Sequence, residues 1–107
     1  FDNESPDSIH LFYDEFSKQY FESTVDKVLQ AEYHLNRNFV LRGDASLTEF
    51  YQFLGLKLET KYDEFGWSIN DEMYWIDFNH YKTTLDDGLE CYIIEIVYTP
   101  EANYMDY

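Results

Sequence analysis

The spacing of apolar residues changes at Gly66 and Trp67, and this change restricts the folds open to the chain more than any other feature. Between residues 25 and 54, apolar side chains recur at the three- and four-residue intervals of helices with one buried face. In residues 73–81 and 90–98 they alternate as in β-strands. A helical region followed by strands is typical of an α+β domain. We therefore predict two helices packed on an antiparallel sheet.

Both helical segments carry a start signal and a stop signal. Each begins at a serine followed three residues later by an acidic residue, which is the spacing of an N-terminal cap, and each ends at a glycine. The serine–acid pairs are Ser23 with Asp26 and Ser46 with Glu49, and the glycines are Gly43 and Gly55. The sequence predicts a long helix up to Gly43 and a shorter helix over residues 47–54, joined by a turn at residues 43–45.

Further patterns define the predicted sheet. Residues 9–13 and 19–22 are aromatic-rich and separated by a short loop, which is typical of an N-terminal β-hairpin. The Asp-Asp-Gly sequence at residues 86–88 indicates a turn between the two later strands. After Glu90, residues 91–98 are apolar on both faces except at Glu95, so we expect this strand to lie inside the sheet.

The chain is long enough for one domain. Its 107 residues are 45% apolar, which allows a buried core without disulfides or metals, and the single Cys91 is expected to pack as a small apolar residue. We predict a flexible leader over residues 1–8, one domain over residues 9–100 and an acidic, tyrosine-rich tail over residues 101–107. Because the chain begins at Phe1, we expect a fragment or a processed product, which an upstream segment could tether to a membrane.

Acidic residues far outnumber basic ones. There are 22 Asp and Glu against 7 Lys and Arg, a formal net charge of -15, and from Tyr62 onward 11 acidic residues face a single base, Lys82. This charge repels phosphate backbones and anionic lipids, which argues against direct contact with nucleic acid or a membrane. A basic protein surface is the favoured partner, because carboxylates pair with lysine and arginine while aromatic rings add contact area and cation–π contacts.

The predicted binding residues are Asp63, Glu64, Asp71, Glu72, Tyr74, Asp86, Asp87 and Glu90. Three other interpretations of the charge stay open. Carboxylates spaced along one face could imitate DNA phosphates and inhibit a host nuclease or another defence protein. A pocket that gathers Arg37, Arg42 or Lys82 could hold an anionic nucleotide signal. The acidity could also serve solubility alone.

No catalytic motif stands out. His10, His34 and His80 lack partners at zinc-site spacing, and the sequence contains no phosphate-binding glycine loop and no nucleophile-elbow motif. We therefore predict no metal, no cofactor and no catalytic residue. The enzyme alternative is a small hydrolase in which Asp77 and Glu95, each within an apolar strand, act as an acid–base pair. It requires the two carboxyl groups to share a pocket.

A series of short motifs follows in order from about His10 to Pro100. The motifs are Phe12-Tyr13-Asp14, Tyr20-Phe21-Glu22-Ser23, Ala31-Glu32-Tyr33-His34-Leu35-Asn36-Arg37, Ser46-Leu47-Thr48-Glu49-Phe50-Tyr51, Leu54-Gly55-Leu56, Gly66-Trp67-Ser68, Trp75-Ile76-Asp77-Phe78 and Asp87-Gly88-Leu89-Glu90-Cys91. Together they resemble an uncharacterised family of phage and prophage proteins from Gram-positive bacteria.

The resemblance implies a source but no activity, cofactor or catalytic residue. Longer members look as if they carry apolar, membrane-spanning segments upstream, so the resemblance implies that this chain is a soluble C-terminal domain of a phage protein, located in the host cytoplasm. The leading hypothesis is a phage-encoded accessory domain that binds a basic host or phage protein.

Overall fold

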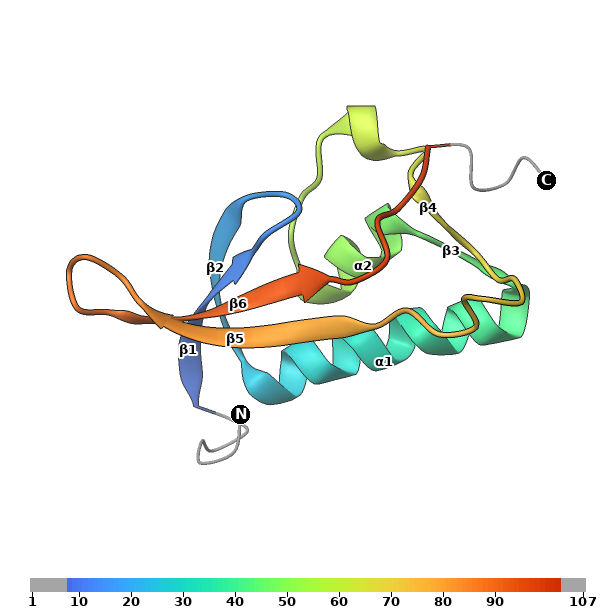
Figure 1. Cartoon of the computed structure of the whole chain (residues 1–107). Coiled ribbons are helices and arrows are strands. Elements are labelled where there is room, and N and C mark those ends of the chain that lie inside the picture. The colour runs from blue at the N-terminus through green and yellow to red at the C-terminus, as the bar shows by residue number, and fades with distance from the viewer. Residues whose placement is uncertain (1–7, 103–107) are drawn as a thin grey trace.

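The computed structural model describes residues 8–102, which fold into two helices, a short 3₁₀ helix and two sheets (Figure 1). The elements, in chain order, are β1 (Ile9–Asp14), β2 (Gln19–Thr24), α1 (Val25–Arg42), β3 (Asp44–Ser46), α2 (Leu47–Leu54), the 3₁₀ helix η1 (Thr60–Tyr62), β4 (Gly66–Ser68), β5 (Phe78–Thr84) and β6 (Glu90–Ile96). Residues 1–7 and 103–107 lie outside the described part, and with them most of the predicted leader and tail. The predicted α+β class is confirmed.

The larger sheet has four strands in the order β2-β1-β6-β5. β1 and β2 form an antiparallel hairpin, and β5 pairs antiparallel with β6, which lies inside the sheet as predicted. β1 and β6 run parallel, so the prediction of a purely antiparallel sheet is wrong. Side chains alternate with the same period in parallel and antiparallel strands, and the apolar pattern therefore does not reveal strand direction.

A buried carboxylate organises the β1–β2 turn. Asp14 is fully buried, and its Oδ2 accepts hydrogen bonds from the Ser17 backbone N–H (2.8 Å), the Ser17 hydroxyl (2.6 Å) and the hydroxyl of Tyr51 on α2. Burial, together with the Asp14 carboxylate, raises the pKa of Tyr51 far above its ordinary 10.0, so this hydroxyl stays protonated and donates. The hairpin is thereby joined to α2.

The helix caps match the predicted type, with one shift of position. α1 is capped by Thr24, whose side-chain oxygen accepts from the Lys27 backbone N–H at 3.1 Å, so the predicted cap at Ser23 is wrong by one residue. α2 begins with the predicted capping box, in which Ser46 and Glu49 each accept the other's backbone N–H. The helices end at Gly43 and Gly55, both in the left-handed conformation, with φ of 86° and 79°.

A second sheet of two strands replaces the turn that was predicted between the helices. β3 pairs antiparallel with β4, with Ala45 opposite Trp67. The Trp67 indole Nε1 donates to the Tyr98 backbone oxygen at 2.7 Å. Gly66 and Glu101 exchange two backbone hydrogen bonds, at 3.0 and 2.9 Å. The folded unit therefore extends past the predicted limit at residue 100.

β5 begins at Phe78, later than the predicted start at residue 73. Asn70 Oδ1 accepts the backbone N–H groups of Glu72 and Met73, at 2.8 and 2.9 Å, which makes a turn there. The buried Asn36 of α1 accepts the Ile76 backbone N–H at 2.7 Å and donates to the Ile76 oxygen at 2.9 Å. This amide takes the place of a neighbouring strand, so Ile76 pairs with α1 instead of the sheet.

The core lies between the helices and one face of the larger sheet. Phe12, Tyr92 and Ile94 contribute to it from β1 and β6, together with buried side chains of α1 and α2. We call this face the inner face. The opposite, outer face contributes none of the described residues to the core cluster.

Candidate functional site

A recess of about 720 Å³ lies beside the C-terminal end of α1. Its walls are Arg42 and Gly43, β4 with the loop after it, and residues 97–101 following β6. Arg42 is the only base among the lining residues, which include the acids Glu72 and Glu101. Whether the recess can hold an anion therefore depends on how far the charge of Arg42 is already compensated.

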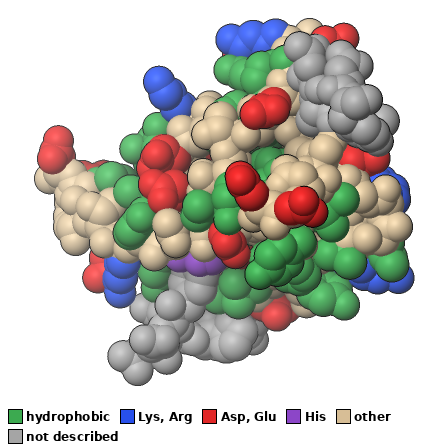
Figure 2. Space-filling view, turned by 45° about the vertical axis from the view of Figure 1, so that its right-hand side comes forward, with side chains coloured by type: hydrophobic (Ala, Val, Ile, Leu, Met, Phe, Trp, Pro, Cys, Tyr) green, Lys and Arg blue, Asp and Glu red, His purple; other side chains and the backbone are tan. Residues whose placement is uncertain are grey.

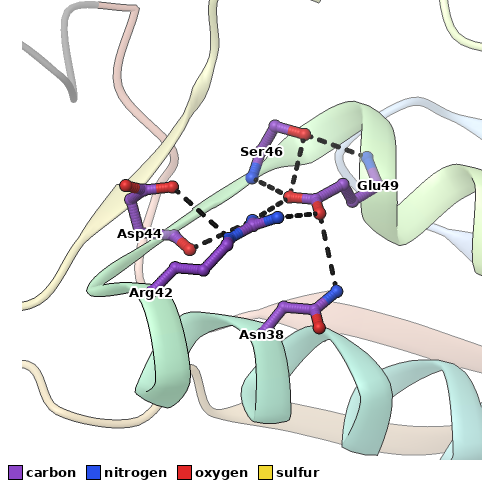
Figure 3. A network of polar contacts seen from close by, with 5 residues as sticks. All are labelled: Asn38, Arg42, Asp44, Ser46 and Glu49. Carbon is purple, nitrogen blue, oxygen red and sulfur yellow. Dashed lines mark hydrogen bonds and ion pairs between the residues drawn. The ribbon is translucent and has the colours of Figure 1, made fainter.

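Arg42 is held by carboxylate and backbone oxygens (Figure 3). Its two terminal nitrogens donate to the two carboxylate oxygens of Glu49, at 2.8 and 2.6 Å, and one of them also donates to the Asp44 backbone oxygen at 3.2 Å. Its Nε lies 3.8 Å from the Asp44 carboxylate. Two-point pairing of this kind is the strong form of an arginine–carboxylate contact. The positive charge of Arg42 is thus neutralised by carboxylates of the protein itself.

Glu49 links the two helices. Burial opposes its ionisation, but hydrogen bonds from Arg42 and from the Ser46 backbone N–H, with the charge of Arg42, outweigh burial and lower the pKa of Glu49 below its ordinary 4.5. Asn38 adds a longer contact of 3.5 Å from α1 (Figure 3). One carboxylate therefore caps α2 and holds the end of α1, which is a structural role.

The eight predicted binding residues fall in three separate segments. All eight are exposed. Asp63 and Glu64 follow η1, Asp71, Glu72 and Tyr74 lie between β4 and β5, and Asp86, Asp87 and Glu90 lie at the β5–β6 turn and the start of β6. The β5–β6 turn and the segment between β4 and β5 are at opposite ends of the molecule (Figure 1). These residues lie on the surface but do not form one continuous patch.

Two of these acids have local partners. Asp87 Oδ1 accepts the Leu89 backbone N–H at 3.1 Å and so belongs to the predicted turn, which is confirmed. Glu90 lies 3.1 Å from the ammonium of Lys82. Both interactions stabilise the β5–β6 hairpin.

Asp77 and Glu95 have different surroundings. Asp77 borders a hollow of about 280 Å³ against α1, and Glu95 is not among its lining residues. Glu95 Oε1 instead accepts hydrogen bonds from Asn79 Nδ2 at 2.9 Å and from the Tyr81 hydroxyl at 3.2 Å. The hydrolase alternative gains no support from this arrangement.

The histidines occupy separate positions. His80 Nε2 lies 2.6 Å from Glu32 Oε2 on α1. His10 contacts Tyr92 edge-on, with ring centroids 5.2 Å apart, and His34 is exposed on α1. Within residues 8–102, no three His, Cys, Asp or Glu side chains are grouped so that they could hold a metal ion.

Cys91 is buried in β6, with 1% of its surface exposed. Burial raises the pKa of its thiol above the ordinary 9.0, which lowers the fraction of reactive thiolate. The prediction that Cys91 packs as a small apolar residue is confirmed.

The outer face of the larger sheet holds a row of side chains that the sequence analysis did not single out. Strand register places Tyr20 opposite Tyr13, Tyr13 beside Ile93, and Ile93 opposite Tyr81. We call these four residues the outer row. The alternation within each strand indicates which side chains share a face. The order of the strands, which brings the four together, has no local signal in the sequence.

Comparisons with known proteins give a family but no activity. No curated protein and no solved structure matches the chain. Neither helix within residues 8–102 has the length and apolar character that crossing a membrane requires. One family model, described as a family of unknown function (DUF6353), matches residues 3–105. Since the match covers nearly all of the 107 residues, the protein belongs to the family of unknown function DUF6353.

Proposed function

We propose that this protein is a phage-encoded accessory domain that acts by binding a basic protein of the host or the phage. The observation that carries the proposal is the uncompensated negative charge after residue 61. Lys82 is the only base in that part of the chain, and its ammonium already lies 3.1 Å from Glu90 and 5.7 Å from the centre of the Tyr92 ring. The phage origin rests on the sequence motifs alone.

The distribution of charge over the surface supports a basic partner. In Figure 2 acidic side chains lie across the middle of the visible face, while the basic ones lie toward its rim. Aromatic side chains are exposed between the acids: Tyr74 is 71% exposed and Trp75 45%. Single exposed ion pairs contribute only about 0–1 kcal/mol. Binding of a basic partner therefore needs aromatic contact area as well as charge.

The geometry favours this proposal over the two alternatives based on charge. A DNA mimic needs carboxylates along one track, whereas the predicted acids fall in three separate segments. An anionic nucleotide needs a free cationic pocket, whereas Arg42 and Lys82 each pair with a carboxylate and Arg37 lines neither of the two hollows described above. Binding of a basic protein is therefore the better supported function.

A selection from a random peptide library on the immobilised 107-residue chain tests the proposal. We expect the recovered peptides to be rich in arginine or lysine with aromatic residues, and their affinity to fall at least about tenfold between low and high salt, because exposed charges are screened. Recovery of peptides without bases, or affinity that does not respond to salt, would contradict the proposal. Competition by duplex DNA for a protein identified from these peptides would point to the DNA-mimic form instead.

The matched control is a variant with lower charge and an unchanged fold. Asp63→Asn, Glu64→Gln, Asp71→Asn and Glu72→Gln change only exposed side chains. We expect the combined variant to recover fewer basic peptides while its circular dichroism spectrum stays the same. Equal recovery by the variant and the original protein would show that these four acids do not attract the peptides.

A further inference from the structure

The larger sheet is covered by helices on one face only. The residues of the outer row come from all four strands, and none of them belongs to the core cluster. Tyr20 is 56% exposed and Tyr81 48%, while Tyr13 and Ile93 are partly exposed. Tyr13 and Tyr20 also pack against each other, with ring centroids 4.6 Å apart. The result is an aromatic stripe about 14 Å wide, given the usual spacing between strands.

The charged side chains that the four strands place on this face are all acidic. Alternation along the strands places Glu22 and Glu95 on the outer face, and no Lys, Arg or His of the four strands shares that face. Glu15 follows β1, and its backbone N–H donates to the Ile94 oxygen at 3.1 Å. Glu15 therefore continues the parallel register and lies next to Glu95.

Glu95 is held in a fixed orientation at the edge of the stripe. Asn79 and Tyr81 both donate to its Oε1, and its Oε2 has no hydrogen-bond partner among residues 8–102. The hydrogen bond from Tyr81 to Glu95 raises the pKa of Tyr81, and the charge of Glu15 adds to this effect. A carboxylate held beside tyrosine rings is suited to an arginine, whose planar guanidinium can pair with the carboxylate and stack on a ring.

We propose that the outer row is the docking surface for an extended protein segment that alternates arginine with apolar side chains. The inference rests on the proposed function and states where on the protein the basic partner binds. Charge complementarity identifies the occupant, because every charged side chain on this face of the strands is acidic. A second copy of the chain is disfavoured, because two such faces would bring Glu22 and Glu95 of both copies together without a base between them.

Titration by NMR tests the inference on the ¹⁵N-labelled 107-residue chain. The probe is an eight-residue peptide that alternates arginine with leucine or tyrosine, and the reference is the same peptide with glutamate in place of arginine. We expect the arginine peptide to shift the amide signals of Tyr13, Tyr20, Tyr81 and Ile93, and the glutamate peptide to shift none of them. Shifts confined to residues 63–64, 71–74 or 86–90 would overturn the inference and leave the proposed function intact.

Matched variants distinguish docking on the outer row from non-specific electrostatic attraction of the peptide to the acidic protein. The double variant Tyr13→Ser with Tyr81→Ser should weaken binding of the arginine peptide at least about tenfold. Tyr74→Ser, which changes a tyrosine that is 71% exposed elsewhere, should change affinity less than about twofold. Equal weakening by both variants would overturn the inference.

Charge variants and oligomeric state complete the test. Glu95→Gln should weaken binding several-fold more than Asp86→Asn, although both remove one negative charge. Equal binding of the arginine and glutamate peptides by the original protein would contradict the proposed function itself, not only this site.

Sedimentation tests whether a second copy of the chain occupies the outer face. A dimer that is present in the original protein and lost in the double variant would show such a second copy and would overturn the inference.

Discussion

The two faces of the four-stranded sheet are built from residues that are neighbours in the sequence. They differ in solvent exposure and in their contact with the core. Phe12 and Ile94 point to the inner face and are 0% exposed. Tyr13 and Ile93, one residue away in each strand, point to the outer face and stay partly exposed. The difference teaches that an apolar strand residue in this chain is not necessarily a core residue. Side chains such as Phe12 and Ile94 stabilise the fold, whereas those of the outer row stay partly accessible to solvent.

Replacement of one residue on each face should separate these two roles most clearly. Phe12→Ala leaves a cavity in the core and should lower the free energy of unfolding by about 3–5 kcal/mol. Tyr13→Ala removes a partly exposed ring and should cost less than about 1.5 kcal/mol. Denaturant unfolding followed by circular dichroism measures both. Similar losses for the two variants would break the comparison.

The inner face also depends on a polar group, Asn36. Asn36→Ala would leave the buried N–H and C=O of Ile76 unpaired, so we expect a loss of about 2–3 kcal/mol. The matched control is Asn38→Ala on the same helix, which removes one contact of 3.5 Å to Glu49 and should cost less than about 0.5 kcal/mol. Thermal unfolding of the two variants checks the order, and a larger loss for the Asn38 variant would contradict it.

The helical layer over the inner face should respond to acid through Glu49. Because the folded-state pKa of Glu49 lies below 4.5, its contribution to stability is full above pH 4.5 and is lost as the pH falls through the lowered value. Glu49→Gln should cost about 1 kcal/mol at pH 7, where both the cap and the ion pair are weakened. The gap between variant and original protein should narrow below pH 4.5. Urea unfolding at several pH values measures it, and a constant gap would be the contrary result.

The smallest expected effect on stability concerns the outer face, where the pKa of Tyr81 reports the influence of the neighbouring Glu95 carboxylate. The hydrogen bond to Glu95 raises the pKa of Tyr81 above 10.0. In Glu95→Gln we expect this pKa to fall back toward 10.0, with no measurable change in the unfolding midpoint, because Tyr81 is 48% exposed. Carbon-13 NMR of labelled tyrosine follows the ring signals through the titration. An unchanged pKa would show that Glu95 does not influence this part of the outer face.

The local elements could be predicted from the sequence to within a few residues, with two exceptions. The capping box of Ser46 and Glu49 and the stop at Gly43 were found because both depend on residues within one turn of helix. The start of β5 was misplaced because Asn36 holds Ile76 from 40 positions away. The two-stranded sheet was missed because β3 and β4 have three residues each, too few to show a period.

The sequence indicated the chemical character of the candidate site better than its position in the fold. Charge and aromatic content, which need no structure, point to a basic partner. The eight predicted binding residues, seven acids and Tyr74, fall in three segments that the fold does not join into one patch (Figure 1). Tyr13 could not be paired with Ile93 in advance, because their register depends on the parallel contact between β1 and β6, whereas Tyr81 meets Ile93 across the β5–β6 hairpin.

The sequence by itself determined the class of the fold, the two capped helices, the hairpins and the strong negative charge, since each follows from composition or from residues a few positions apart. Only the tertiary structure decided that β6 lies between β1 and β5, that the two helices pack on one face of the sheet, and that aromatic residues form a row on the other face. The physical reason is that side-chain alternation has the same period of two for any strand order and either direction. The order and direction of the strands are fixed only when one face of the sheet packs against the helices.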